Sequence, residues 1–219
     1  MNNNRTIAKL AGWSIILMAV VAGFSFGFAF PKIFNPAQID AYQTNLTVNV
    51  QLYTYMLIGI LIVLVLDVVV SWTLYLYFKN DNRKIALLSG VLRIVYTVIF
   101  GIATYYLARN LASPDYNNEI ITENYNSFQT IWSFGLIVFG VHLLVIGVLM
   151  KLHKRIPAFL WCLTIIAGAS YMLVHGLKTT MPQLTELTTT LNNILGLPMA
   201  LGELALAIWL LIKGGKLIK

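Results

Sequence analysis

The chain has 219 residues, of which 58% are hydrophobic and 11% are charged, and its mean hydropathy is +0.77. A soluble domain carries about 25% charged residues, so this composition excludes an ordinary soluble fold and predicts a membrane protein. The net charge of +7 does not indicate nucleic-acid binding, because the basic residues lie beside apolar runs rather than in one patch. The single cysteine, Cys162, excludes disulfides within the chain and a cysteine-based zinc site.

The first apolar run covers about residues 10–30 and follows a short polar start. It is long for a signal peptide and lacks a clear small-x-small cleavage site, so we interpret it as a retained transmembrane span. Ala19, Gly23 and Gly27 form a stripe of small residues, which predicts close packing against another helix. A polar connection at 31–51 follows.

Two longer apolar runs, about 54–78 and 85–107, are joined by the charged turn 79–84. Each exceeds the roughly 20 residues that cross a bilayer as a helix. Asp67 is the one acid of the first run and Arg93 the one base of the second. In an antiparallel hairpin the two lie within about 3 Å of the same depth. A lone charge at the bilayer centre costs about 2.5–3.5 kcal/mol, so we predict that Asp67 and Arg93 pair.

The second half of the chain predicts three more spans. Residues 109–127 are interpreted as an acidic, Asn-rich loop, and about 128–150 as a fourth span containing His142. A basic turn at 151–155 leads to a fifth span at about 156–177. A Thr-rich segment follows, and its apolar residues recur at helical spacing, which predicts a short helix on the membrane surface. The sixth span, about 194–212, contains Pro198 and Glu203.

The predicted fold is therefore an all-α polytopic bundle of six transmembrane helices in a single membrane domain, 1–219. Six spans place eleven bases on one side of the membrane: Arg5, Lys9, Lys79, Arg83, Lys84, Lys151, Lys154, Arg155, Lys213, Lys216 and Lys219. Three bases lie on the other side, with the acids Asp40, Asp115, Glu119, Glu123 and Glu186. The positive-inside rule predicts that both termini, from Asn2 to Lys219, are cytoplasmic.

Four ionisable residues fall inside the predicted spans: Asp67, Arg93, His142 and Glu203. Each lies about 9–12 residues from the cytoplasmic end of its span, which is one layer at a depth of about 14–18 Å. Four such residues at one depth should face inward and pair around a polar cavity. We take them, with Tyr75 and Tyr96, as candidate ligand-binding residues. A purely structural pin that fixes helix register is the alternative.

The sequence gives little support for a metal site, a nucleotide site or a catalytic site of a common type. The chain has no HExxH motif, paired-carboxylate spacing, phosphate-binding loop, dinucleotide fingerprint or Gly-x-Ser-x-Gly elbow, so we predict no metal and no cofactor. His175 lies about ten residues from the layer and is interpreted as an interfacial histidine. Ser71 and Ser89 are candidate nucleophiles without an identifiable neighbouring base.

Several short motifs follow one another in order along the chain. They are DVVVSW at 67–72, LRIVY at 92–96, FGVHLL at 139–144, Ile156-Pro157 and GELALAIWLLIKG at 202–214. In order and spacing the chain resembles the bacterial multi-pass family catalogued as domain of unknown function 4386. The resemblance covers nearly the whole chain and implies an acid, an arginine, a histidine and a glutamate at the four layer positions. It implies a bacterial cytoplasmic membrane protein and supplies no activity.

Two functions of different classes remain. The first is a protein that binds or translocates a small solute, cation or proton at Asp67, Arg93, His142 and Glu203. The second is a membrane-embedded enzyme, in which His142 or Glu203 is the acid or base and Arg93 holds an anionic lipid headgroup. A structural or accessory role is the third interpretation. Expected partners are the lipid bilayer and a small polar ligand or lipid headgroup, with no nucleic acid.

Overall fold

The computed structural model of the protein describes residues 3–112 and 117–216. Asn2, Asp115 and Lys219, which entered the prediction of orientation, lie outside the described residues. The elements in chain order are α1 (Asn3–Ala22), the π-helix η1 (Gly23–Ala29), α2 (Phe30–Ile33), the 3-10 helix η2 (Ile39–Ala41), α3 (Tyr42–Val48), α4 (Val50–Phe78), α5 (Arg83–Arg109), α6 (Asn118–Leu152), α7 (Ala158–Thr180), the 3-10 helix η3 (Pro182–Leu184) and α8 (Thr185–Ile212).

Within the described ranges, six helical segments are long and apolar enough to cross a membrane: Asn4–Ile33, Val50–Phe78, Arg83–Arg109, Asn118–Leu152, Ala158–Thr180 and Pro182–Ile212. Their number confirms the prediction of six spans. The protein is therefore an all-α, multi-pass membrane protein.

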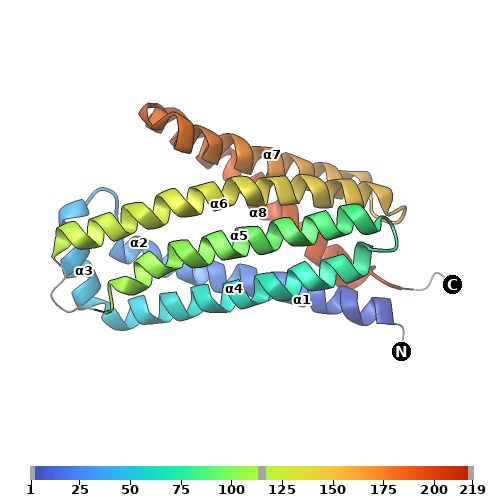
Figure 1. The fold of residues 1–219 in the computed structure, drawn as a ribbon, viewed down its shortest axis with the longest axis horizontal. Helices are drawn as coiled ribbons and strands as arrows, with labels where there is room; N and C mark the ends of the chain where they lie inside the picture. Colours follow the sequence, from blue (N-terminus) through green and yellow to red (C-terminus); the bar gives the residue numbers. More distant parts are fainter. Residues whose placement is uncertain (1–2, 113–116, 217–219) are drawn as a thin grey trace.

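The six long helices pack in the cyclic order α1, α4, α5, α6, α7, α8, and α8 returns to α1 to close a ring. The start of α1 and the end of α8 lie at the same end of the bundle (Figure 1). We call this the terminal end and the opposite one the distal end. Toward the distal end, α7 diverges from the other helices in this view (Figure 1). The ring encloses the layer in which the four ionisable residues were predicted to meet.

Arg5 closes the ring at the terminal end. Its guanidinium donates to the carbonyl oxygens of Leu210 at 3.0 Å, Leu211 at 2.5 Å and Gly214 at 2.7 Å. These carbonyls belong to the last turn of α8 and the residues after it, which have no helical N–H partner further along the chain. A cation at a helix C-terminus also interacts favourably with the helix dipole. Arg5 thereby fixes the end of α8 to the start of α1.

We expect Arg5→Ala to loosen this junction without unfolding the bundle. The loss of charge-assisted bonds should cost about 1–3 kcal/mol locally. The amide hydrogens of Lys213 and Gly214, which both donate to the Trp209 carbonyl, should then exchange with solvent about tenfold faster. Hydrogen exchange read by mass spectrometry tests this, with Lys9→Ala, an exposed base on the same helix, as the control. Equal exchange in both variants would contradict the assignment.

The contact between α6 and α7 depends on two facing glycines. A Cβ atom placed on Gly140 would lie 2.7 Å from the Gly168 carbonyl oxygen, and one placed on Gly168 would lie 2.7 Å from the Gly140 oxygen. Any side chain at either position would have to push the two backbones apart. Small residues permit this close approach between helices in a membrane, where apolar packing replaces the hydrophobic effect.

Three boundaries differ from the sequence prediction. The predicted loop 109–127 is only partly a loop, because α6 begins at Asn118, where the Asn117 side chain caps the helix by accepting from the Ile120 N–H at 3.0 Å. The connection 31–51 contains α2 and α3. The Thr-rich segment does not form a separate surface helix: Thr185 begins α8, and the helix continues without interruption through Pro198 to Ile212.

The prediction that a stripe of small residues in the first span packs against another helix was wrong in part. Gly23 and Gly27 belong to the π-helix η1, and no atom outside their own helix lies within 4 Å of a Cβ placed on either. Ala19 instead lines a cavity. The close contact that η1 does make comes from Ser25, whose Oγ donates to the Met56 carbonyl at 3.3 Å. Gly23 and Gly27 are therefore exposed and do not form a packed interface with another helix.

Candidate functional site

Arg93 of α5 lies inside the ring, and its side chain is completely buried. Its Nε donates to Asp67 Oδ1 at 2.9 Å, and its Nη2 donates to the same oxygen at 2.7 Å. This contact confirms the predicted ion pair between the two helices of the 54–107 hairpin.

Glu203 of α8 binds the same guanidinium from across the ring. Arg93 Nη1 forms an ion pair with Glu203 Oε1, and Nη2 lies 3.3 Å from Oε2. One cation is therefore shared by two carboxylates, from α4 and from α8. Glu203 is the member of this trio nearest the surface, with 9% of its area exposed against 1% for Asp67 and 0% for Arg93. The trio carries a charge of −1 when both carboxylates are ionised.

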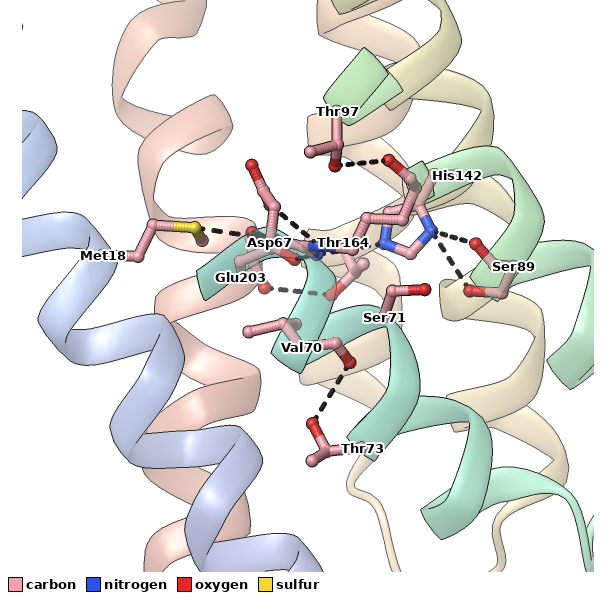
Figure 2. A network of polar contacts seen from close by, with 12 residues as sticks. Met18, Asp67, Val70, Ser71, Thr73, Ser89, Thr97, His142, Thr164 and Glu203 are labelled. Atoms are coloured by element: carbon pink, nitrogen blue, oxygen red, sulfur yellow. Dashed lines mark hydrogen bonds and ion pairs between the residues drawn. The ribbon is translucent and has the colours of Figure 1, made fainter. Parts of the chain in front are cut away.

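His142 of α6 completes the predicted set, as Figure 2 shows together with Asp67 and Glu203. Its Nε2 lies 3.3 Å from Arg93 Nη1, and its Nδ1 lies 2.9 Å from the Ser89 carbonyl oxygen. A guanidinium can only donate and a carbonyl can only accept. The imidazole is therefore neutral here, with its proton on Nδ1 donated to Ser89 and its Nε2 accepting from Arg93. All four ionisable residues meet at one place, as their common depth predicts.

The guanidinium of Arg93 has no hydrogen-bonding capacity left for another ligand. Its five N–H groups are matched by Asp67 Oδ1, His142 Nε2, both Glu203 oxygens and the sulfur of Met18, which lies 3.8 Å from Nη2. The second oxygen of Asp67 differs, because Oδ2 makes no hydrogen bond with any described residue. The cluster thus presents an acceptor to a ligand rather than a donor.

Three hydroxyl groups donate hydrogen bonds to backbone carbonyls of the helices on which the cluster residues lie. Ser71 Oγ donates to the Gly90 carbonyl at 2.9 Å and joins α4 to α5. Thr164 Oγ1 donates to the Gly202 carbonyl at 3.1 Å and joins α7 to α8 one residue before Glu203. Thr97 Oγ1 donates to the carbonyl of Arg93 itself at 2.8 Å. These bonds fix the helices whose side chains converge.

A cavity of about 330 Å³ lies against the cluster, with Asp67, Arg93 and Glu203 in its wall. Most of the remaining lining is apolar or aromatic: Ile15, Met18, Ala19, Ala22, Phe26, Val63, Tyr96, Phe100, Trp132, Leu136, Phe139, Tyr171, Met199, Ala200 and Leu204. The charged trio is therefore the polar end of an otherwise hydrophobic and aromatic chamber. Such a shape, with few polar groups at one point, is typical of small-molecule sites.

Two tyrosines were predicted to join the site, and the structure places them differently. Tyr96 lines the cavity, with its ring 4.8 Å from that of Phe139. Tyr75 does not line it; its ring lies 5.9 Å from that of Trp72. A binding role for Tyr75 in this cavity therefore has no geometric support.

His175 lies apart from the cluster, as its position in the sequence predicts. It lines a second cavity of about 490 Å³ near the distal end, together with Lys178 and residues at the start of α8. Only 9% of its area is exposed, and its Nδ1 has no hydrogen-bond partner in the described part of the chain. Its ring stacks 6.1 Å from that of Tyr171, which lines the central cavity.

Sequence reasoning missed the contribution of α1 and the aromatic wall. Met18 and Phe26 of this first span line the cavity, and Met18 contacts the guanidinium. Trp132 and Phe100 face it from α6 and α5, with ring centroids 5.6 Å apart. Apolar and aromatic residues are as common on lipid-facing helix surfaces as in a cavity wall, so the composition of these helices did not indicate which residues line the cavity. Phe100 lies two helical turns beyond Arg93 and on the same face of α5, so the helical phase relative to Arg93 would have selected it.

No group of three or more histidine, cysteine or acidic side chains in residues 3–112 and 117–216 is placed to hold a metal ion. Asp67 and Glu203 both bind Arg93, whose guanidinium lies between their carboxylate groups.

The geometry defines a polytopic helix bundle with a buried, charge-sharing cluster beside an aromatic cavity. The chain belongs to the family described as domain of unknown function DUF4386, which matches residues 10–214. It is also similar to an uncharacterized protein of Archaeoglobus fulgidus, with 28% identity over 169 residues, covering 77% of this chain and 90% of the relative. That relative is archaeal, so similarity of this kind does not place the chain in a bacterium. No solved structure matches the chain.

Proposed function

We propose that the protein binds, and by exchange carries, a proton or a small cationic solute at the Asp67–Arg93–Glu203 cluster. The observation that carries this proposal is the charge balance of a buried site in which two carboxylates share one guanidinium. An unpaired charge in the membrane interior is costly, so the cluster is expected to acquire one further positive charge. A proton on a carboxyl group or a cation beside Asp67 Oδ2 supplies it.

Competition between these two positive charges would couple them. A cation that binds beside Asp67 and Glu203 favours the ionised carboxylates, and protonation of either carboxylate removes its attraction for the cation. A site that accepts one or the other is the basic element of an exchanger. The titratable or charged side chains that face this site are Asp67, Tyr96, Arg93, His142, Tyr171 and Glu203.

The enzyme interpretation has less support. Arg93 has no free N–H with which to hold an anionic headgroup unless its ion pairs break. His142 carries its proton on Nδ1, the nitrogen that lies 3.1 Å from Ser89 Oγ, so it cannot remove the hydroxyl proton of Ser89. We therefore favour binding over catalysis.

The proposed setting is a cytoplasmic membrane with the terminal end of the bundle inside. The basic residues of the described chain gather at that end, including Arg83 and Lys84 at the start of α5 and Lys154 and Arg155 in the turn between α6 and α7. In this orientation the cluster is reached from the outer half of the membrane. A bacterial inner membrane is the specific location that we propose.

Infrared difference spectroscopy tests the proposal. When the pH of the purified protein is lowered, one carboxyl group in the cluster should take up a proton and show a carbonyl band that resists deuterium exchange. Glu203→Gln should abolish this band, because the variant has one carboxylate and one guanidinium and needs no further positive charge. Glu186→Gln makes the same substitution at an exposed position of α8 and should keep the band.

The band should also weaken when a cation is added at constant pH. A wild-type spectrum without any exchange-resistant band that Glu203→Gln or Asp67→Asn removes would show that the cluster takes up no proton. The cluster would then be an ion-pair network that only fixes the register of the helices.

A further inference from the structure

We infer that the cavity beside the cluster binds an organic ammonium ion with an apolar or aromatic group, and this inference rests on the proposed function. The ammonium would lie against Asp67 and Glu203, and the apolar group would fill the chamber.

The charge of the ligand follows from the polar end of the cavity. Arg93 is engaged by both carboxylates and by His142, so its guanidinium offers an anion no free N–H. The two carboxylates exceed the one guanidinium by one negative charge, and Asp67 Oδ2 has no partner among the described residues. A neutral ligand would leave that charge uncompensated, whereas a monovalent cation neutralises it.

The aromatic wall favours an organic cation. Phe26 and Phe100 each stack on Trp132, with centroid distances of 4.7 Å and 5.6 Å. Tyr96 and Tyr171 line the same chamber. Aromatic faces attract cations, and rings grouped around a site are the usual means of recognising alkylated ammonium groups. The rings also bury the apolar part of such a ligand.

A bare inorganic cation fits this wall poorly. Mg²⁺ and Ca²⁺ take six or more oxygen ligands in close geometry. The side chains that line the cavity offer oxygen from two carboxylates and two tyrosine hydroxyls only. The remainder of the wall is carbon, the sulfur of Met18 and Met199, and the nitrogens of Arg93 and Trp132, which donate hydrogen bonds and do not bind a cation. An ammonium with bulky substituents keeps little of a hydration shell, so it does not require the missing oxygens.

The cavity reaches the surface between α1 and α8. Ala200 in its wall is exposed, and Ala19 and Ala22 are half-buried. Farther toward the distal end, a Cβ atom placed on Gly23 of η1 or on Gly196 of α8 would have no atom outside its own helix within 4 Å. Neither glycine is therefore packed against another helix. An amphipathic solute dissolved in the bilayer can approach the cavity beside Ala200.

Equilibrium binding of benzyltrimethylammonium to the full chain in phosphatidylcholine nanodiscs tests the inference, with empty nanodiscs as baseline. Neopentylbenzene has the same shape without the charge, and benzenesulfonate carries the opposite charge. We expect the cation to bind at least about tenfold more tightly than either compound and not to be displaced by an equal concentration of K⁺. Comparable binding of neopentylbenzene, or displacement of benzyltrimethylammonium by K⁺, would overturn the inference. The wild-type protein alone is sufficient for this test.

Two matched pairs of variants locate the site. Glu203→Gln should weaken binding about tenfold or more, and Glu186→Gln should not change it. Trp132→Leu, in the wall, should weaken binding about fivefold, and Trp13→Leu, which is 62% exposed, should not. Unchanged binding in both Glu203→Gln and Trp132→Leu would overturn the assignment to this cavity.

The two proposals fail in different ways. If benzyltrimethylammonium does not bind but the exchange-resistant carboxyl band responds to pH, the ligand class is wrong and proton binding stands. If the cation does not bind and that band is missing, both proposals fail.

Discussion

Arg93→Leu is expected to lower the stability of the protein more than any other single substitution in the cluster. The change strands two carboxylates, Asp67 and Glu203, inside the bundle without a counter-charge. Breaking a buried ion pair by removing one partner costs about 3–5 kcal/mol, and here two pairs are lost together. The thermal midpoint in detergent, read by the loss of monodisperse protein on size-exclusion chromatography, measures the effect.

A series of compensating substitutions separates the charge effect from the loss of packing. Asp67→Leu with Arg93→Leu leaves one stranded carboxylate, and the triple variant that adds Glu203→Leu leaves none. We expect stability to recover stepwise, because a buried ionic group replaced entirely by apolar residues is often neutral. Arg109→Leu, at the end of α5, is the control for loss of an arginine from the same helix. A double variant no more stable than Arg93→Leu would show that the residues are not coupled.

The sequence alone predicted the helix number and the central ion pair because both follow from the cost of polar groups in lipid. Each span is recognisable by length, and a charge within it must find a partner, so Asp67 and Arg93 at equal depth could be paired without coordinates. The same depth argument brought in His142 and Glu203. It does not depend on knowing which helices are neighbours.

What the sequence could not provide is the rotation of each helix about its axis. Lipid and the bundle interior are both apolar, so Trp132 in the cavity wall and Trp13 on the surface have similar sequence surroundings. The sharing of one guanidinium between α4 and α8 depends on ring closure, which no local pattern encodes. For the same reason Gly23 and Gly27 were assigned to a packed interface, although both are exposed and have open space around them.

Helix continuity was underestimated for a related reason. Polar residues such as Thr185, Thr188 and Thr189 are poor indicators of a span, yet each can donate its hydroxyl to a carbonyl of its own helix or of the turn before it, and all three do so. The hydropathy pattern therefore placed the start of the sixth span at about residue 194, although the helix itself begins at Thr185.

The position of Glu203 depends on the residue before it. A Cβ atom on Gly202 would lie 2.5 Å from the Cβ of Ala167 on α7, well inside ordinary carbon–carbon contact distance. Gly202→Ala should therefore force α8 away from α7, at a cost of about 1–3 kcal/mol. The same movement would weaken the hydrogen bond from Thr164 Oγ1 to the Gly202 carbonyl and withdraw Glu203 from Arg93.

Gly196→Ala supplies the matched control, because it makes the same change in the same helix where nothing outside the helix lies within 4 Å of the new methyl group. Alanine is the better helix former, so this variant should be unchanged or more stable by up to about 1 kcal/mol. We expect Gly202→Ala to lower the thermal midpoint and to weaken the exchange-resistant carboxyl band, and Gly196→Ala to do neither. Equal midpoints and equal bands in the two variants would mean that contact between α7 and α8 does not set the position of Glu203, and that the ion pair with Arg93 forms independently of how closely these helices pack.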